Sequence, residues 1–560
     1  MTEIPRLVIA APSSGHGKTA VSVGLLAAFA GRGLTVAGFK IGPDYVDSGY
    51  LGLASGQPGR NLDPRLQGVD RVAPLFAHGA AGSDIAVVEG TMGLYDDLSG
   101  GGEGTSTAQV AGLLKAPVVL VVDVAAMGQS VGALVHGFRS FDELLWLGGA
   151  VLTGVISDRH EQILRESLGD LGVPVLGALR RRALTPLPNR QLGVAPVVDR
   201  STDAVRAVRR LGSVVASCVD LERLLALARS APDLVTDVWS PLDAFAAASA
   251  NPPTRQLRTV SDASRVAPVS PAGPGGSGGS GAPSGPSGPG PAAPASAAPA
   301  SSAPSPVSSA PAPASAPPAD ASGEASPDEA GDSDADKTKA VSVPPPAERA
   351  GQRAAERQSQ PAAGRPVVAV AGGPAFSYSY PETIELLDAA GAEVVAFDPL
   401  RDEALPPGAR GLVFGGAFPE LYADELSANE PLCREVAELA FRGAPVIAES
   451  AGLLWLVKEF DGRPMCGVLN ASAQTTNGQV LGYRSAIARA SSPLAPLGAT
   501  VVGHKAHRTL VTPRSGENSA WQWRGGQPEG FVWRKVHASY LNLHWAGYPT
   551  IAKRFVSALG

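Results

Sequence analysis

Cysteine is scarce in this sequence, which has only Cys218, Cys433 and Cys466 among its 560 residues. The three are far apart, so they provide neither the paired spacing of a disulfide framework nor the clustered spacing of a zinc site. With 44% apolar residues, the chain can instead form two or three domains with hydrophobic cores of their own.

Long hydrophobic runs and an excess of positive charge are also missing. No apolar stretch reaches the roughly 18 residues of a membrane span. The first apolar run, Arg6–Ala11, is short and has no basic start, which predicts a buried strand rather than a signal peptide. The formal net charge of −6, without a basic stripe, argues against general nucleic-acid binding. We expect a cytoplasmic protein that binds neither membranes nor nucleic acid.

One long segment lacks almost every residue type that builds a core. Residues 271–320 are Ala, Pro, Ser or Gly except for Val307 and Asp320, and the flanking residues are polar and rich in proline. Such a composition cannot bury enough apolar surface to offset the entropy of ordering. We predict a disordered linker over 251–365, between one domain at 1–250 and another at 366–560.

Apolar runs alternate with amphipathic stretches in both predicted domains. Near-continuous apolar runs are typical of parallel strands that are buried on both faces. Alternating strands and helices predict a doubly wound α/β sheet in the first domain and a second α/β domain after the linker. The strands expected in the first domain are Arg6–Ala11, Leu34–Lys40, Asp84–Val88, Ala116–Asp123, Gly149–Ile156 and Val173–Ala178. Those expected in the second are Pro366–Ala371, Ala392–Phe397, Gly411–Phe414 and Ala444–Ala448.

The first predicted strand leads into a glycine-containing loop and then a helix, Lys18–Gly31. This order is typical of a phosphate-binding loop, in which backbone N–H groups and the helix N-terminus face the phosphates. Lys18 would reach the β- and γ-phosphates, and the Thr19 hydroxyl could bind Mg²⁺. The loop departs from the general pattern at Pro12, where a glycine is usual. The predicted ATP-binding residues are Ser14, Gly15, His16, Gly17, Lys18 and Thr19.

Acidic residues follow two other strands of the first domain. Glu89 ends the strand Asp84–Val88, at the edge where open α/β sheets bind ligands, and is placed to hold Mg²⁺. Asp44 and Asp47 lie three residues apart in a turn that contains glycine and proline. These two acids could bind a second metal or position a substrate, or they could cap a helix.

In the second domain, the strand Ala444–Ala448 passes through small residues into a predicted helix, Ala451–Phe460. A strand that breaks into a helix in this way presents one side chain at the top of the sheet, where a nucleophile would sit. That side chain is Ser450.

Several long motifs resemble one family, the cobyrinic or hydrogenobyrinic acid a,c-diamide synthases of corrin biosynthesis. In the first domain they are SSGHGKT, KIGPDYVDSGY, GRNLDP and VVEGTMGLYDD. In the second they include AGGPAFSYSYPETIELLDAAGAEVV, VFGGAFPELYADELSAN and VHASYLNLHWAG. The resemblance covers about 1–230 and 366–560. It implies a dethiobiotin-synthetase-like P-loop domain followed by a class I-type glutamine amidotransferase domain.

The resemblance also implies a reaction. ATP would activate the a and c side-chain carboxylates of hydrogenobyrinate or cobyrinate as acyl phosphates, and ammonia would then form the amides. Lys18, Thr19, Glu89 and Mg²⁺ would serve the phosphoryl transfer, and Asp44 and Asp47 would orient the substrate or a metal. Family members also imply a homodimer. The sequence does not tell whether the ring contains cobalt, although its composition and the motifs of the second domain resemble actinobacterial members of the family, and this resemblance favours the cobalt-free substrate.

The second domain departs from the family pattern at the residues that hydrolyse glutamine. Ser450 stands where the family has its cysteine nucleophile. The activating histidine falls on Asn542 in one alignment, which leaves His544 as a neighbour, and on His544 in the other. Serine needs a well-placed base and asparagine cannot act as one. We therefore expect weak or absent glutaminase activity, with Ser450 and His544 working together as the alternative.

Two other functions are compatible with parts of the pattern. The replacement of the family's cysteine nucleophile by Ser450 favours a non-catalytic paralogue that binds nucleotide or corrinoid. The complete phosphate loop favours an enzyme. A switch ATPase of the partitioning type is disfavoured, because GPDYVDSGY and GRNLDP resemble a site for a carboxylate substrate.

Overall fold

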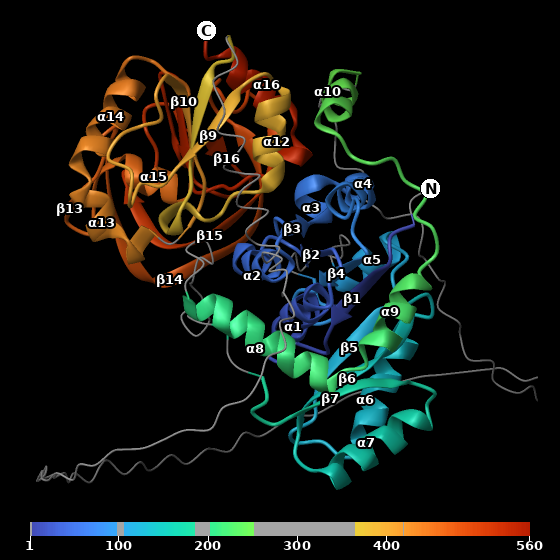
Figure 1. Cartoon of the computed structure of the whole chain (residues 1–560). Coiled ribbons are helices and arrows are strands. Elements are labelled where there is room, and N and C mark those ends of the chain that lie inside the picture. Colours follow the sequence, from blue (N-terminus) through green and yellow to red (C-terminus); the bar gives the residue numbers. More distant parts are fainter. Residues whose placement is uncertain (1–2, 98–105, 185–186, 188–201, 251–363, 418) are drawn as a thin grey trace, which may run out of the picture. The chain divides into compact units, whose positions relative to one another are not determined.

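The computed structural model describes residues 3–97, 106–184, 187, 202–250, 364–417 and 419–560 (Figure 1). The described residues of both predicted domains belong to one compact unit. The predicted linker lies almost wholly outside the described residues, and the domain limits at 250 and 366 stay a prediction. Among the described helices, none combines the length and the apolar character that crossing a membrane requires.

The first domain is built on a seven-stranded parallel sheet in the order β3-β2-β4-β1-β5-β6-β7. Its strands are β1 (Arg6–Ala10), β2 (Val36–Ile41), β3 (Arg60–Leu62), β4 (Ile85–Glu89), β5 (Val118–Asp123), β6 (Leu147–Val155) and β7 (Val175–Arg180). Its helices are α1 (Lys18–Gly31), α2 (Tyr45–Ser55), α3 (Pro64–Gln67), α4 (Val69–Gly79), α5 (Thr107–Leu113), α6 (Ser130–Phe141), α7 (Asp158–Gly169), α8 (Thr202–Cys218), α9 (Leu221–Arg229) and α10 (Pro241–Ala250).

Helices cover both faces of this sheet, because alternate side chains of each strand point to opposite faces. On β1, Leu7 and Ile9 belong to a core with helices α1, α2, α8 and α9. Val8 and Ala10, on the other face of the same strand, belong to a core that includes α4 to α7. The predicted doubly wound α/β fold is therefore confirmed.

The second domain has a six-stranded sheet in the order β17-β18-β11-β10-β8-β9, in which only β17 runs antiparallel to its neighbour. A second sheet contains β13-β12-β14-β15, with β16 paired to β14. The strands are β8 (Val367–Ala371), β9 (Glu393–Phe397), β10 (Ala409–Phe414), β11 (Val446–Glu449), β12 (Val457–Phe460), β13 (Arg463–Pro464), β14 (Leu469–Ala488), β15 (Thr500–Thr512), β16 (Trp521–Gln522), β17 (Phe531–Trp533) and β18 (Val536–Ser539). The helices are η3 (Pro374–Phe376), α12 (Pro381–Ala389), η4 (Pro419–Leu421), α13 (Ala423–Ala428), α14 (Glu430–Phe441), α15 (Ala451–Leu456), η5 (Trp545–Gly547) and α16 (Thr550–Ser557).

The prediction of one helix over Ala451–Phe460 was wrong beyond Leu456. Residues Val457–Phe460 form β12, which pairs with β13 and β14. Within β12 the apolar end residues are buried and the charged middle two are exposed, and pairing with the neighbouring strands decides the conformation of this short segment. The second sheet, with its long strands β14 and β15 (Figure 1), was missing from the sequence-based description.

Candidate functional site

The loop between β1 and α1 has the backbone that a phosphate-binding loop requires. Gly15 and Gly17 have φ angles of 94° and 91°, in the left-handed region that favours glycine. The Lys18 ammonium donates to the backbone oxygens of Ser13, at 3.0 Å, and Met92. These bonds hold Lys18 across the mouth of the loop, next to the segment that follows β4.

Side chains from neighbouring strands support the same loop. The His16 Nδ1 accepts a hydrogen bond from the backbone N–H of Asp123, at the end of β5, at 2.8 Å. The Thr153 hydroxyl of β6 donates to the His16 carbonyl at 3.0 Å. Ser14 is exposed at the tip of the loop. The loop is therefore fixed from two strands, while its tip stays accessible.

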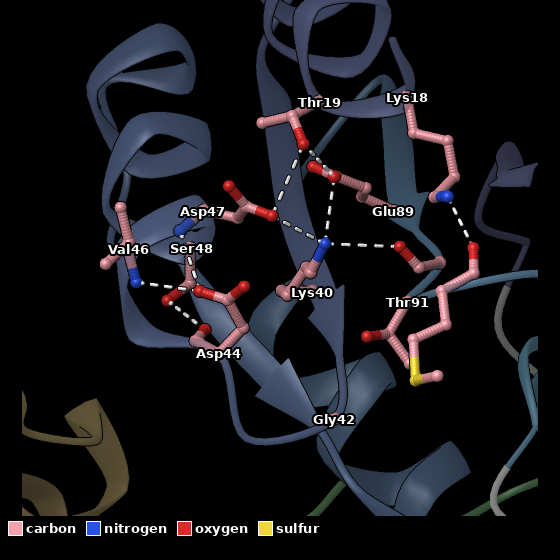
Figure 2. A network of polar contacts seen from close by, with 12 residues as sticks. Lys18, Thr19, Lys40, Gly42, Asp44, Val46, Asp47, Ser48, Glu89 and Thr91 are labelled. Carbon is pink, nitrogen blue, oxygen red and sulfur yellow. Dashed lines mark hydrogen bonds and ion pairs between the residues drawn. The ribbon is translucent and has the colours of Figure 1, made fainter. Parts of the chain in front are cut away.

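Behind the loop lies a buried network that centres on Lys40 (Figure 2). The Lys40 Nζ is 2.8 Å from Asp47 Oδ2 and 2.9 Å from Glu89 Oε1, and it also donates to the Gly90 carbonyl at 3.2 Å. The Thr19 hydroxyl donates to the same Glu89 oxygen at 2.5 Å and lies 3.3 Å from Asp47 Oδ2. The structure thus brings together Thr19, Asp47 and Glu89.

Burial makes the charges in this network depend on one another. Burial would lower the pKa of Lys40, but Glu89 and Asp47 raise it above its ordinary value. Burial raises the pKa of Glu89, and the adjacent Lys40 opposes that shift. The Lys40 ammonium therefore limits the rise in the pKa of Glu89 that burial causes, and this pKa lies at about 7.

Sequence reasoning missed Lys40. The signal lay in strand register, because Lys40 and Glu89 are direct partners on the adjacent parallel strands β2 and β4. Two strands that end in residues of opposite charge predict such a pair, provided that the sequence also reveals that the two strands are neighbours. The order of strands in the sheet supplied that missing information.

Asp44 and Asp47 have different surroundings, although the sequence analysis proposed the same possible roles for both. Asp44 is the N-cap of α2, and its side chain accepts from the backbone N–H groups of Val46, at 2.9 Å, and Asp47, at 3.0 Å (Figure 2). This is the capping role that the sequence analysis left open. Burial and the neighbouring Asp47 raise the pKa of Asp44. Asp47 instead turns toward Thr19 and Lys40.

The donor set around Glu89 fits a magnesium ion. Mg²⁺ prefers oxygen ligands and binds through one or two carboxylates together with phosphate oxygens. Glu89 Oε2 is buried and has no hydrogen-bond partner among the described residues, which leaves a ligand position open beside Thr19 and Asp47. Within the described ranges, no cluster of three or more His, Cys, Asp or Glu side chains could hold a metal by itself. The fit therefore depends on the Thr19 hydroxyl and on bound phosphate.

The strand-to-helix elbow of the second domain is present at Ser450. This residue joins β11 to α15 with φ 49° and ψ −98°, a conformation that is strained for a side chain other than glycine. Its backbone N–H donates to the Ser539 carbonyl at 2.8 Å, and Ser450 is only 4% exposed. The chain therefore holds Ser450 in the geometry of a nucleophile elbow.

Asn542 lies beside this elbow. A Cβ atom added to Gly416 would be 3.0 Å from Asn542 Oδ1 and 3.5 Å from the Ser450 Cβ, so the three residues surround one small space. The Asn542 amide donates to the carbonyls of His504, at 3.3 Å, and Tyr540, at 3.4 Å.

His544 has other partners. Its Nε2 is 2.8 Å from Gln67 Nε2 and 3.7 Å from Glu382 Oε2, and its ring packs on Tyr380 at 3.9 Å between centroids. The side chain is fully buried, and burial lowers the pKa of His544 to about 3. The structure thus brings Asn542, and not His544, next to the elbow.

A cavity of about 430 Å³ is lined both by residues near the phosphate site and by residues of the elbow. Its lining includes Asp44, Asp47 and Thr91 of the first domain and Ser450, His504 and His507 of the second. Burial lowers the pKa of His504 and of His507 to about 4, so both rings are neutral at pH 7. Ser450 of the second domain shares one cavity with Asp44 and Asp47 of the first.

These features define a class: a P-loop nucleotide-binding domain joined to a domain of the glutamine amidotransferase type. Residues 7–194 match the family model of the CobQ/CobB/MinD/ParA nucleotide binding domain. Residues 367–549 match that of the CobB/CobQ-like glutamine amidotransferase domain. The chain belongs to the family of the hydrogenobyrinate and cobyrinate a,c-diamide synthases.

Three curated relatives match nearly the whole chain. A hydrogenobyrinate a,c-diamide synthase of Streptomyces coelicolor is 49% identical, over 99% of this chain and 97% of its own length. One of Thermobifida fusca is 38% identical over the same shares of the two chains. A cobyrinate a,c-diamide synthase of Gloeobacter violaceus is 32% identical, over 98% of this chain and 96% of its own length.

Proposed function

We propose that this chain catalyses the ATP- and Mg²⁺-dependent amidation of the a and c side-chain carboxylates of hydrogenobyrinate in cobalamin biosynthesis. We further propose that it uses ammonia, because its hydrolysis of glutamine is impaired. The relatives named for hydrogenobyrinate, at 49% and 38% identity, support the cobalt-free substrate over cobyrinate, whose named relative is 32% identical.

One observation carries the proposal: the phosphate-site network is complete, whereas the elbow is altered. Short polar contacts connect Thr19, Lys40, Asp47 and Glu89 behind a glycine loop, and the Ser13 carbonyl holds Lys18 at that loop. Phosphoryl transfer depends mainly on positioning and charge stabilisation, which is what such a network supplies.

The chemistry that we assign to the first domain has two steps. A carboxylate oxygen of the substrate attacks the γ-phosphorus of ATP, the bond to the ADP oxygen breaks, and an acyl phosphate forms. Ammonia then attacks the acyl carbon, phosphate leaves, and the nitrogen loses a proton. The Lys18 ammonium would contact the phosphates, and Thr19, Asp47 and Glu89 would hold Mg²⁺. When bound, Mg²⁺ neutralises part of the phosphate charge.

The second domain supports the nitrogen source that we propose. A glutaminase of this type needs a nucleophile whose proton an adjacent base removes. Ser450 lies beside Asn542, and an amide side chain is not a base. His544 is buried against Gln67, Glu382 and Tyr380. We therefore assign Asn542 to the position of the activating histidine and leave His544 outside the glutaminase machinery.

The test measures conversion of hydrogenobyrinate by purified protein with ATP and Mg²⁺, with ammonium chloride in one reaction and glutamine in another. Product with ammonium alone is the expected result. Equal product from glutamine would contradict the impaired elbow and favour Ser450 working with a histidine. Product in neither reaction, with nucleotide still bound, would favour the non-catalytic paralogue, for which the substitutions at the elbow are the specific evidence.

A further inference from the structure

Tyr45 occupies a position between the two acids of the first domain. It is the first residue of α2, directly after the N-cap Asp44 and two residues before Asp47. Whatever fixes the Tyr45 ring therefore also fixes the turn that carries both carboxylates. Its ring neighbours come from the second domain: Tyr378 stacks on it at 4.6 Å between centroids with 11° between planes, and Tyr380 lies at 4.9 Å.

The backbone of Tyr378 is itself held beside the elbow. Its N–H donates to the Gly416 carbonyl at 2.9 Å, and the Gly416 N–H donates to the Tyr378 carbonyl at 3.1 Å. The approach is close, because a Cβ atom added to Gly415 would lie 2.4 Å from the Tyr378 oxygen. A continuous set of contacts thus runs from the loop beside Ser450, through the two rings, to the acids.

We propose that Tyr378 is a positioning residue for amidation: its ring holds Tyr45, and thereby fixes the start of α2, which carries the Asp44 cap and the Asp47 carboxylate of the amidating site. This inference rests on the proposed function. It gives the second domain a task that needs neither a cysteine nor glutamine, namely to complete the amidating site. Asp44, Tyr45, Asp47, Tyr378 and Ser450 all line the same cavity, which is where such a role would be exercised.

The stacking geometry determines which part of Tyr378 matters. Nearly parallel rings interact through their faces, so the contact with Tyr45 depends on the aromatic ring of Tyr378. Y378F should therefore keep the function and Y378A should lose it. Phe441 offers a matched control. It is an aromatic residue of the second domain that makes a ring contact, with Trp533 at 5.6 Å between centroids, and it is not among the residues that line the cavity.

The experiment measures ammonium-supported amidation by the full-length protein and its Y378A, Y378F and F441A variants. We expect kcat/KM for hydrogenobyrinate to fall about 10- to 100-fold in Y378A, because a small displacement of a positioning group costs that much. Y378F and F441A should stay within about twofold of the wild type. The KM for ATP should change less than kcat/KM for hydrogenobyrinate, because Lys18 bonds to Ser13 and Met92, and Glu89 to Thr19 and Lys40, all of which lie outside α2.

A double-mutant cycle keeps the test decisive if Y378A folds poorly. Y45L, Y378L and the double variant retain apolar volume, and the double variant should lose no more activity than the worse single variant. Losses that multiply, or a Y378A enzyme that behaves like F441A, would overturn the inference while the proposed function stands. A wild-type protein without ammonium-supported product would overturn the proposed function, and this inference with it.

Discussion

Lys40 places one positive charge between the carboxylates of Asp47 and Glu89, and all three side chains are buried. A buried ion pair contributes little net stability, because desolvation of the charges offsets their attraction. Removing one member is different, since the remaining charges are then buried without compensation. Lys40 is therefore the residue of the first domain whose loss has the clearest expected consequence.

The substitution K40M should abolish ammonium-supported amidation and lower the free energy of unfolding by about 3–5 kcal/mol, the usual cost of breaking a buried pair. Denaturant unfolding at pH 7 measures the stability. K458M is the matched control, because Lys458 is exposed on β12 and should change stability by less than about 0.5 kcal/mol. Equal effects of the two substitutions would contradict the proposed charge balance.

The stability difference between K40M and the wild type should grow as the pH rises. Burial raises the pKa of Glu89 above its ordinary 4.5, and removing the Lys40 charge raises this pKa further. Below about pH 7 the folded wild type and the folded variant both hold this proton, whereas at higher pH only the variant keeps it, so the stability difference grows from about pH 7 upward. Unfolding measured from pH 5 to 8 tests this sign, and a difference that shrinks toward pH 8 would refute it.

The elbow at Ser450 gives a third prediction at the residue scale. The double substitution S450C and N542H should raise glutamine hydrolysis by at least about 100-fold, because it supplies a thiol and a base together. S450C alone should gain much less. H544N serves as the control, since His544 contacts Gln67, Glu382 and Tyr380 and should not affect hydrolysis by the restored enzyme. Full restoration by S450C alone would show that another base, such as His504, serves the site.

At the scale of secondary-structure elements, α12 meets β3 through charged side chains. Glu382 and Glu385 lie one turn apart on α12, and Arg60 of β3 binds them at 2.6 and 2.5 Å. His78 of α4 adds a contact to Glu385 at 3.0 Å. Burial would raise the pKa of Glu385, but the hydrogen bonds from His78 and Arg60 and their charges lower it to about 2.

Glu385 should therefore make the stability of the protein sensitive to acid. A carboxyl whose pKa is lowered on folding adds stability above its ordinary value of 4.5, and this stability is lost as the pH falls toward 2. E385Q should lower the free energy of unfolding by about 2 kcal/mol at pH 7 and by less at pH 4, measured with urea. E438Q, at the exposed pair with Arg442, is the control and should have almost no effect. An E385Q effect that is the same at both pH values would contradict this assignment.

Which strands could be predicted from the sequence depended on their pattern of apolar residues. The parallel strands were predictable, because strands such as β1 and β5 are nearly continuous apolar runs buried on both faces. The strand β14 was not, because most of its central residues are polar and exposed, as at Gln474 and Thr475, and its pairing with β15 fixes its conformation.

The candidate site was predictable to the same degree. The glycine loop and the elbow follow from local sequence. The Lys40–Glu89 pair and the choice between Asn542 and His544 depend on residues that are far apart in the sequence. Strand order decides the first, and the contact of His544 with Gln67, 477 positions away, supports the assignment of Asn542 that we propose for the second.

At the scale of the whole molecule, the two domains contact each other through buried side chains within one compact unit. Asp63 accepts from the Tyr483 hydroxyl at 2.8 Å, and Gln67 and Arg60 make the contacts already described to His544 and to the acids of α12. These contacts are independent of the sequence between the domains. The composition of 251–365 predicts a connection that need only be long enough to join them.

Deleting residues 271–320 should therefore leave ammonium-supported amidation within about twofold of the wild type. The residues removed are almost entirely Ala, Pro, Ser and Gly. About 65 residues of the predicted linker remain, and a Gly- and Ser-rich chain of that length can bridge on the order of 40–50 Å. A variant with the same fifty residues in scrambled order separates the effect of length from that of sequence. If the deletion and the scrambled variant both lose activity more than about tenfold, the segment carries sequence-specific information. Loss in the deletion alone would instead mean that the domains need a longer tether, because they separate during the reaction.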